Sequence, residues 1–208
     1  DQTYYDMRFM VKAGKGHTMK TIGFIGGGNM AQALLAGVLK AGLVKPAQTW
    51  VSDVRAERLD ELRDEYGIHV TPDNTELTHR ADTVVLSVKP QVMPDVLKSI
   101  AGSLKPDVLV ISIAAGITTT SIRQILGDVQ IVRVMPNTPA LAGAGASGLY
   151  SANASAANLK TALALCTSVG KAVLVDSEDL MDAVTAVSGS GPAYFFRLME
   201  DMINAGVS

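Results

Sequence analysis

Residues 21–37 read TIGFIGGGNMAQALLAG, and this stretch decides the fold. An apolar run meets a glycine cluster and then a helical pattern. Gly26, Gly28 and Ala31 follow the spacing G-x-G-x-x-G/A of a dinucleotide-binding turn. The first glycine allows a tight turn, the second lets backbone approach a pyrophosphate, and the alanine lets the helix pack close to the strand. The motif predicts a dinucleotide site at the helix N-terminus, and the alternative is an ordinary tight turn between strand and helix.

Strands and helices alternate along the chain after this turn. Continuous apolar runs at 83–88 and 108–113 are typical of strands buried on both faces of a parallel sheet. Further strands are expected at 22–25, 49–52, 68–70, 130–134 and 172–175, and helices at 56–66, 91–100, 119–126 and 154–169. The alternation predicts an α/β fold with a doubly wound (Rossmann) parallel sheet.

The pattern changes after the last predicted strand. Helical patterns occupy 180–187 and 193–205, and the sequence SGSGP at 188–192 is expected to break the helix between them. Two consecutive helices predict the start of an all-α domain in 177–208, after a dinucleotide-binding domain in 19–176. Because the apolar face of this second domain has hardly begun where the sequence stops, we expect the native protein to continue.

Composition excludes several classes of protein. The 208 residues are 48% hydrophobic and 18% charged, and the formal net charge is −2. Without a basic run, nucleic-acid binding is not expected, and no apolar run reaches the length of a membrane span. The single cysteine, Cys166, excludes an internal disulfide and lies in an apolar helical run, which predicts a buried thiol. The three histidines lack ligand spacing, so no metal site is expected.

Residues 1–18 differ from the chain that follows them. They lack the pattern of a secretory signal peptide, and Met19 stands directly before the first strand as a natural start. We expect a peripheral leader or tag in 1–18 and a cytoplasmic protein.

In a doubly wound sheet, ligands bind beyond the carboxyl ends of the strands. After the second predicted strand, Asp53 stands where an acidic residue accepts the ribose 2′-hydroxyl of NAD. Arg55 and Arg58 instead suit the 2′-phosphate of NADP, and the alternative is that both are solvated helix residues. The sequence therefore predicts a dinucleotide and leaves the choice between NAD and NADP open.

The later strand ends carry few polar groups. Pro90 pushes Lys89 out of the helical region, so that this lysine can face a sugar-phosphate; the alternative is a loop lysine. Small residues at 114–116 would let a flat nicotinamide ring lie against the backbone. After the sixth strand, prolines bracket Asn137 and Thr138, and the glycine-alanine tail of that loop is expected to cover the site.

The SGSGP segment supplies the last candidates. Pro192 suits the first turn of a helix, whose N–H groups, with the hydroxyls of Ser188 and Ser190, form a candidate site for a substrate carboxylate. The alternative is ordinary helix capping. The sequence shows no Ser-His-Asp arrangement and no paired catalytic carboxylates. This small polar inventory suits hydride transfer, in which a cofactor carries the chemistry and the protein positions it and excludes water.

Five motifs together resemble the pyrroline-5-carboxylate reductase family. They are GFIGGGNMA at 23–31, SVKP at 87–90, SIAAG at 112–116, MPNTP at 135–139 and VSGSGPAY at 187–194. They occur in the family's order and spacing, and the likeness runs from about residue 19 to residue 208. The resemblance implies reduction of 1-pyrroline-5-carboxylate to L-proline with NAD(P)H, the last step of proline biosynthesis. It also implies a helical domain that forms an intertwined homodimer, from which larger assemblies are built.

The resemblance also implies site residues. Cofactor contacts, with NADPH expected and NADH as the alternative, fall on Ile25, Gly26, Gly27, Gly28, Asn29, Met30, Asp53, Arg55, Asn74, Ser87, Val88, Lys89, Pro90, Ile113, Ala114 and Ala115. Substrate contacts fall on Asn137, Thr138, Ser188, Gly189 and Ser190. Thr138 and Ser190 are the catalytic candidates, because their hydroxyls are alternatives to water as the proton source. In the family the substrate carboxylate is held largely by a later helical segment, and this sequence stops before it.

Two other functions stay open. A β-hydroxyacid dehydrogenase shares the first domain but requires a catalytic lysine on a helix of the second, and 177–208 contains no lysine. A nucleotide-binding module without catalysis would bind NADPH and show no turnover. The sequence favours the reductase over both.

Overall fold

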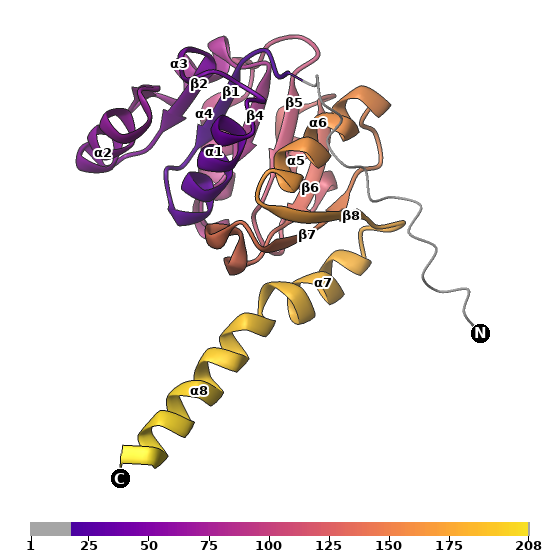
Figure 1. The fold of residues 1–208 in the computed structure, drawn as a ribbon. Coiled ribbons are helices and arrows are strands. Elements are labelled where there is room, and N and C mark those ends of the chain that lie inside the picture. The colour runs from indigo at the N-terminus through magenta and orange to yellow at the C-terminus, as the bar shows by residue number, and fades with distance from the viewer. Residues whose placement is uncertain (1–17, 208) are drawn as a thin grey trace.

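An eight-stranded sheet forms the centre of the molecule (Figure 1). The computed structural model describes residues 18–207, so the predicted leader lies outside the described residues apart from Thr18. The strands are β1 (Ile22–Ile25), β2 (Thr49–Ser52), β3 (His69–Thr71), β4 (Thr83–Leu86), β5 (Leu109–Ser112), β6 (Gln130–Met135), β7 (Gly145–Tyr150) and β8 (Gly170–Leu174). Their spatial order is β3-β2-β1-β4-β5-β6-β7-β8.

Helices cover both faces of this sheet (Figure 1). They are α1 (Asn29–Lys40), α2 (Ala56–Tyr66), α3 (Asn74–Arg80), α4 (Met93–Ile100), α5 (Thr119–Leu126), α6 (Ala156–Thr167), α7 (Leu180–Val184) and α8 (Gly191–Val207), with a π-helical segment at Thr185–Gly189 and short 3-10 turns at Pro46–Gln48, Pro90–Val92 and Thr138–Ala142. Helix α1 packs against α6, while α4 packs against α3 and α5. Neighbouring residues of β1, Phe24 and Ile25, belong to different hydrophobic clusters, because successive side chains of a strand point to opposite faces.

The predicted α/β fold with a doubly wound sheet is confirmed. Strands β1 to β6 are parallel and follow the order 3-2-1-4-5-6 that is typical of dinucleotide-binding sheets. The elements predicted at 22–25, 49–52, 56–66 and 119–126 have those bounds, and the ends of the other predicted strands, and of the helices before α7, differ by one or two residues. The predicted burial of Cys166 is confirmed, since its side chain has no exposed surface.

Strand β7 and helix α3 are absent from the sequence prediction. The glycine-alanine segment predicted to cover the site is in fact an inner strand, antiparallel to β6 and parallel to β8. A side chain at Gly148 would lie 2.8 Å from Val184, and one at Gly145 would lie 2.9 Å from Ala140. The prediction of a covering loop is therefore wrong, because the small residues serve close packing of a strand.

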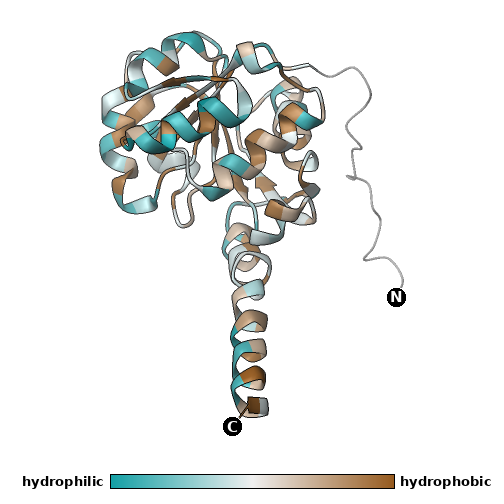
Figure 2. Ribbon diagram, turned by 60° about the vertical axis from the view of Figure 1, so that its left-hand side comes forward, coloured by the Kyte–Doolittle hydropathy of each residue, from teal (hydrophilic) through white to brown (hydrophobic). Residues whose placement is uncertain are grey.

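Helices α7 and α8, with the π-helical segment between them, form an arm (residues 180–207) that extends away from the sheet (Figure 1). The predicted break at SGSGP is wrong, because the π-helical segment continues α7 and Ser190 keeps a helical φ of −87° and ψ of −24°. Helix α8 has no buried residue in the part described, and Figure 2 shows apolar segments recurring along it. Its exposed apolar side chains include Phe195, Phe196, Leu198, Met199, Met202 and Ile203. No helix within 18–207 is long and apolar enough to cross a membrane.

Candidate functional site

The residues predicted to hold a ligand gather at one edge of the sheet. Ile25, Asp53, Ser87, Ile113 and Asn137 stand at or just after the carboxyl ends of β1, β2, β4, β5 and β6. Because these five strands are parallel, their carboxyl ends meet at the same edge, which is where doubly wound sheets bind ligands. Within the described residues, no group of three or more His, Cys, Asp or Glu side chains could hold a metal ion.

The glycine turn has the geometry that its sequence predicts. Gly26 has a φ of 96°, and its N–H donates to the carbonyl oxygen of Ser52 at 2.7 Å. A Cβ on Gly26 would lie 2.8 Å from the backbone oxygen of Ser87, so only glycine fits. A Cβ on Gly28, by contrast, would meet nothing within 4 Å. Gly26 therefore makes the tight turn, and Gly28 leaves open space beside it.

The N-terminus of α1 opens into this space. No side chain caps it in the described chain, and the first backbone bond runs from the N–H of Gln32 to the carbonyl oxygen of Gly28, at 2.9 Å. The N–H groups of residues 29–31 precede that bond and are the free donors of a helix start. Free donors and the positive end of the helix dipole suit a pyrophosphate, so these residues fit a dinucleotide.

Gly27 is held from both sides by the segment that follows β2, an arrangement we call the Gly27 clamp (Asp53, Arg58 and Gly27). The N–H of Gly27 donates to Asp53 Oδ2 at 2.8 Å, and Arg58 Nε donates to the Gly27 carbonyl oxygen at 2.6 Å. Arg58 Nη2 also donates to Gln32 Oε1 on α1, at 2.6 Å. With its side chain only 16% exposed, Arg58 is committed to the turn, so the alternative of a solvated helix residue is wrong for it.

Asp53 pairs with Arg55 as well as with the turn. The guanidinium of Arg55 donates to both carboxylate oxygens, at 3.0 and 3.1 Å, and its side chain stays 58% exposed. Desolvation raises the pKa of Asp53, but hydrogen bonds from Arg55 and from Gly27 outweigh it and hold the pKa below its ordinary value. An ionised Asp53 and an exposed Arg55 therefore stand together where a ribose would lie.

Two hydroxyls brace the same edge. Ser87 Oγ donates to the carbonyl oxygens of Ile25, at 2.9 Å, and Gly26, at 2.7 Å. Ser52 Oγ donates to Asn74 Oδ1 at 2.7 Å and so brings Asn74 to the carboxyl end of β2. The amide nitrogen of Asn74 has no hydrogen-bond partner among residues 18–207 and remains a donor for a ligand.

Sequence reasoning from residue types alone missed Asn74, because it missed α3. The signal was present in the sequence. Asp73 and Glu76 have the spacing of a helix-start pattern, and in the structure Asp73 caps α3 by accepting the Thr75 N–H at 2.8 Å. A helix beginning there places Asn74 in its first turn, beside the end of β2.

Two further predicted segments follow β4 and β5 at the same edge of the sheet. Lys89 is extended, with φ −62° and ψ 145°, as predicted for a residue before proline. Its side chain is exposed and makes no ion pair or hydrogen bond within the described chain. Ala114 is buried and Ala115 is half-buried, and Gly116 turns the chain with a φ of 71°. The turn after β5 therefore carries only short side chains at 114–116, and a nicotinamide ring against it stays a prediction.

The two segments predicted to meet the substrate contact each other. Asn137 Oδ1 accepts the Ala146 N–H at 2.8 Å, and its amide nitrogen donates to Ser188 Oγ at 3.3 Å. A Cβ on Gly189 would lie 2.7 Å from the Cε of Met135, so the Met135 side chain packs closely against the backbone of Gly189. The MPNTP loop and the π-helical segment therefore form one surface, although 51 residues separate Asn137 from Ser188.

Unlike Asn137 and Ser188, the catalytic candidates Thr138 and Ser190 make no side-chain hydrogen bond within the described residues. Both hydroxyls are therefore free to meet a ligand. The backbone near Ser190 is less free than predicted. The Ser190 N–H donates to the carbonyl oxygen of Thr185 at 2.8 Å, and the Ala193 N–H donates to the carbonyl oxygen of Ser190 at 3.0 Å. Because the helix continues through SGSGP, its N–H groups are largely paired, and the anion site predicted from a free first turn keeps mainly the hydroxyls.

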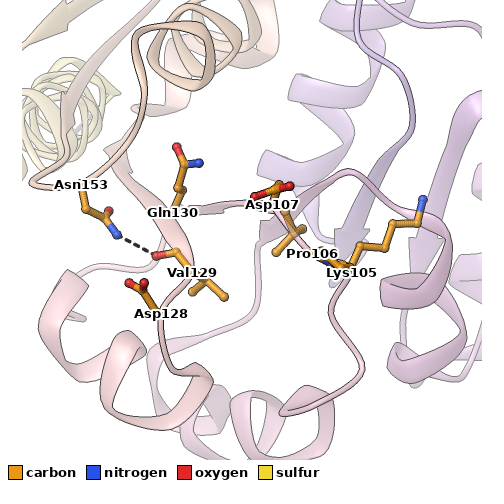
Figure 3. A pocket seen from close by; sticks show the side chains of 8 residues that line it. Lys105, Pro106, Asp107, Asp128, Val129, Gln130 and Asn153 are labelled. Carbon is orange, nitrogen blue, oxygen red and sulfur yellow. Dashed lines mark hydrogen bonds between the residues drawn. The ribbon is translucent and has the colours of Figure 1, made fainter.

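A pocket of about 320 Å³ lies at the opposite edge of the sheet (Figure 3). Its lining comes from the loops that precede β5 and β6 and from Asn153 after β7. Asn153 donates to the carbonyl oxygen of Val129 at 2.8 Å, and Gln130 accepts from Ser155 and Asn158. None of the described lining residues is a predicted site residue. The side-chain amides of Asn153 and Gln130 form hydrogen bonds within the fold.

Two family models match the chain, and the curated relatives most similar to it share one name. Residues 21–116 match the model described as NADP oxidoreductase, coenzyme F420-dependent, and residues 178–208 match the model described as pyrroline-5-carboxylate reductase dimerisation. The pyrroline-5-carboxylate reductase of Pseudomonas aeruginosa is 51% identical over 187 residues, which are 89% of this chain and 68% of that protein.

Solved structures give the same result. A pyrroline-5-carboxylate reductase from Coxiella burnetii superposes with a TM-score of 0.82 at 39% identity, over 91% of this chain and 71% of that one. A pyrroline carboxylate reductase from Plasmodium falciparum with NADP bound superposes with a TM-score of 0.81 at 30% identity, over 92% of this chain and 70% of that one.

Proposed function

The chain belongs to the pyrroline-5-carboxylate reductase family, and we propose on this premise that the carboxyl edge of its sheet holds NAD(P)H and substrate side by side. It is an NAD(P)H-dependent oxidoreductase that reduces the C=N bond of 1-pyrroline-5-carboxylate, the reaction of proline biosynthesis. One observation carries the placement of the site: the Asn137–Ser188 contact lies at the same edge as the glycine turn.

The cofactor half of this site uses groups that the fold leaves unpaired. The free N–H groups at the start of α1 would hold the pyrophosphate, beside the open space at Gly28. Asp53 would accept ribose hydroxyls, and Arg55 would pair with a 2′-phosphate. Because both side chains are present at one place, we propose that the protein accepts NADH and NADPH, with NADPH preferred.

The substrate half positions a cyclic imine. The bound reduced nicotinamide supplies a hydride to the C=N carbon. In this proposal the MPNTP loop and the π-helical segment hold the ring against the turn at 114–116, where the side chains are small. The hydroxyls of Thr138 and Ser190, free of partners among residues 18–207, orient the ring nitrogen or the water that protonates it.

The direct test follows oxidation of NADPH by the full-length protein when pyrroline-5-carboxylate is added. We expect turnover, and a fall in kcat of about 100-fold in Thr138→Val or Ser190→Ala if that hydroxyl takes part in proton transfer. Binding of NADPH without turnover would replace the reductase with a non-catalytic nucleotide-binding module. Turnover of a 3-hydroxyacid in place of the imine would indicate a β-hydroxyacid dehydrogenase.

Assembly and domain division are also proposals. Residues 177–208 would begin a helical domain in which the exposed apolar side chains of α8 pack against a second copy of this chain. A homodimer or higher homo-oligomer in the cytoplasm, without nucleic acid or membrane partners, is the form that we propose. Sedimentation of the full-length protein decides its size, and a monomer at micromolar concentration would contradict the proposal.

A further inference from the structure

One carboxylate, just before the arm, joins it to strand β6 and helix α5. Glu178 lies between β8 and α7, and its Oε1 accepts the backbone N–H of Thr119 at 2.8 Å. Its Oε2 accepts the hydroxyl of Thr119 at 2.9 Å. Arg133 Nη1, from β6, donates to Glu178 Oε1 at 3.2 Å. Strand β6, the first turn of α5 and the start of the arm therefore meet at Glu178.

The arginine of this linkage is buried. The side chain of Arg133 is 4% exposed, and that of Glu178 is 19% exposed. A buried guanidinium is costly without a partner, so the geometry of such a pair is strongly constrained. The other acid in reach, Asp182, lies 3.5 Å away and is 83% exposed. Within 18–207, the ion pairs between the arm or its root and the sheet domain all use Arg133.

The linkage lies at the root of both substrate segments. Arg133 precedes Asn137 by four residues on the same strand and loop. Glu178 precedes Ser188 by ten residues, along α7 and the π-helical segment. Further along, these segments meet at the 3.3 Å bond between Asn137 and Ser188 and at the close approach of Met135 to Gly189, and α7 packs against β7. A shift of Glu178 relative to Arg133 would therefore move Ser188 relative to Asn137.

We propose that the Arg133–Glu178–Thr119 linkage is a positioning device for the reaction. It touches neither substrate nor cofactor. It fixes the spacing between the MPNTP loop and the π-helical segment, and so the orientation of the imine ring, which rests on the proposed function of these segments. The glycine turn depends on its own clamp, so the linkage acts on the substrate segments and leaves the glycine turn unchanged.

Substitution of Glu178 separates these two halves. Glu178→Gln keeps the size of the side chain and loses its charge. We expect kcat/KM for pyrroline-5-carboxylate to fall about tenfold and KM for NADPH to change less than about twofold. The matched control is Asp179→Asn, the same chemical change at the next residue, which is exposed and makes no side-chain bond in the described chain. It should behave as the unmodified protein.

A second pair of variants keeps the test open if Glu178→Gln does not fold. Thr119→Val removes only the hydroxyl that donates to Glu178 Oε2, and Thr119→Ser retains it. We expect the same split between substrate and cofactor in the valine variant, about threefold in size, and rescue by serine. Equal losses for substrate and cofactor, or none in either Glu178→Gln or Thr119→Val, would overturn the proposal.

Amide hydrogen exchange gives a readout that does not depend on turnover. In Glu178→Gln the N–H groups of residues 185–190 should exchange faster, and those of β1 should not change. Unchanged exchange at 185–190 would contradict the linkage as a positioning device. If the unmodified protein fails to reduce pyrroline-5-carboxylate, the proposed function is lost, whereas the exchange comparison still decides whether the linkage holds the segment.

Discussion

The glycine turn and the arm hold their functional residues in opposite ways. The turn is surrounded by its own neighbours: Asp53 and Arg58 hold Gly27, and Ser87 holds Gly26. The arm extends away from the sheet, and α8 has no buried residue in the part described (Figure 2). Its root depends on one buried ion pair and a few close contacts.

This difference indicates which segments determine cofactor binding and which determine substrate binding. In the proposed site the cofactor half is built from β1, β2, β4, β5 and their connections, so substitutions around the glycine turn should act mainly on NAD(P)H binding. The substrate half combines segments that are distant in sequence, and the arm that follows it carries exposed apolar side chains. Each prediction below tests whether the two halves are separate in this way.

The largest effect is expected from Gly26→Ala. The added Cβ meets a backbone oxygen, not a flexible side chain, and φ of 96° is strained for alanine. NADPH affinity should fall about 100-fold, because misplacement of the turn moves the free N–H groups from the pyrophosphate. Titration of NADPH against protein fluorescence measures the loss.

Gly67→Ala is the matched control for that variant. Gly67 also has a positive φ, 65°, but a Cβ there meets nothing within 4 Å. The free energy of unfolding should fall by about 1 kcal/mol without a change in NADPH affinity. Equal loss of NADPH affinity in the two variants would mean that general instability, not the close approach to Ser87, weakens the site.

Removal of the Arg58 side chain should have the next largest effect. Arg58→Ala leaves the Gly27 carbonyl oxygen without its donor, and a hydrogen bond to a charged group contributes about 1.5–3 kcal/mol. We therefore expect KM for NADPH to rise about tenfold with kcat nearly unchanged. Arg58→Lys should recover part of this loss, because lysine keeps the charge but not the fork.

Arg63 provides the control on the same helix. Its side chain is 49% exposed and pairs only with Asp60 and Asp64 within the described residues. Arg63→Ala should leave both KM values within about twofold, as is usual for exposed ion pairs. A comparable rise in KM for NADPH would show that loss of any arginine from α2 weakens the site, and the Gly27 clamp would lose its specific role.

The separation of the two halves also explains what the sequence could predict. In the cofactor half, a chain of short-range rules applies: an apolar run, a glycine turn and an acid at the end of the next strand. Gly26 and Asp53 were predictable because each answers a local requirement. The clamp by Arg58 was not, since the same arginine on an exposed helix would give the same sequence pattern.

In the substrate half, local rules misled. The glycines of β7 resemble a flexible loop, although Gly148 is there because Val184 packs against it. Likewise SGSGP resembles a helix break, although a π-helical segment carries the chain through it. In both places contacts between distant segments decide the structure, and no window of sequence contains them. The role of Glu178 was missed for the same reason, because its partners lie on β6 and α5.

A smaller effect is expected at Asp53. Asp53→Asn keeps an acceptor for the Gly27 N–H but loses the charge that a ribose hydroxyl and Arg55 share. KM should rise about fivefold for NADH and about twofold for NADPH, since a freed Arg55 still pairs with a 2′-phosphate. Michaelis constants for the two cofactors give the ratio. A larger loss for NADPH would reverse the assigned roles of Asp53 and Arg55.

The same carboxylate has a pH signature. Although burial raises the pKa of Asp53, hydrogen bonds from Arg55 and Gly27 lower it overall. Its contribution to stability is therefore complete above the unfolded pKa of about 3.9 and is lost as the pH falls through the lower folded pKa. The difference in Tm between the unmodified protein and Asp53→Asn should be constant from neutral pH to about pH 5 and shrink in stronger acid. A difference that grows in acid would contradict the ion pair.

The last prediction concerns the accessibility of two thiols to a reagent, one on α6 and one on the arm, and does not test catalysis. Burial raises the pKa of the Cys166 thiol to about 12, and a hydrogen bond with Ser147 opposes the shift only in part. The folded protein should therefore resist iodoacetamide at pH 8, whereas unfolded chain reacts.

In a Cys166→Ala background, Met199→Cys places a thiol on the arm, where the native residue is 57% exposed. That thiol should react rapidly at high dilution and slowly at high protein concentration if, as proposed, a second copy of the chain covers it. Reaction at one rate over all concentrations would show that the arm is not an interface between copies. Resistance of Cys166 in the unmodified protein would still show that this thiol is buried in the folded chain.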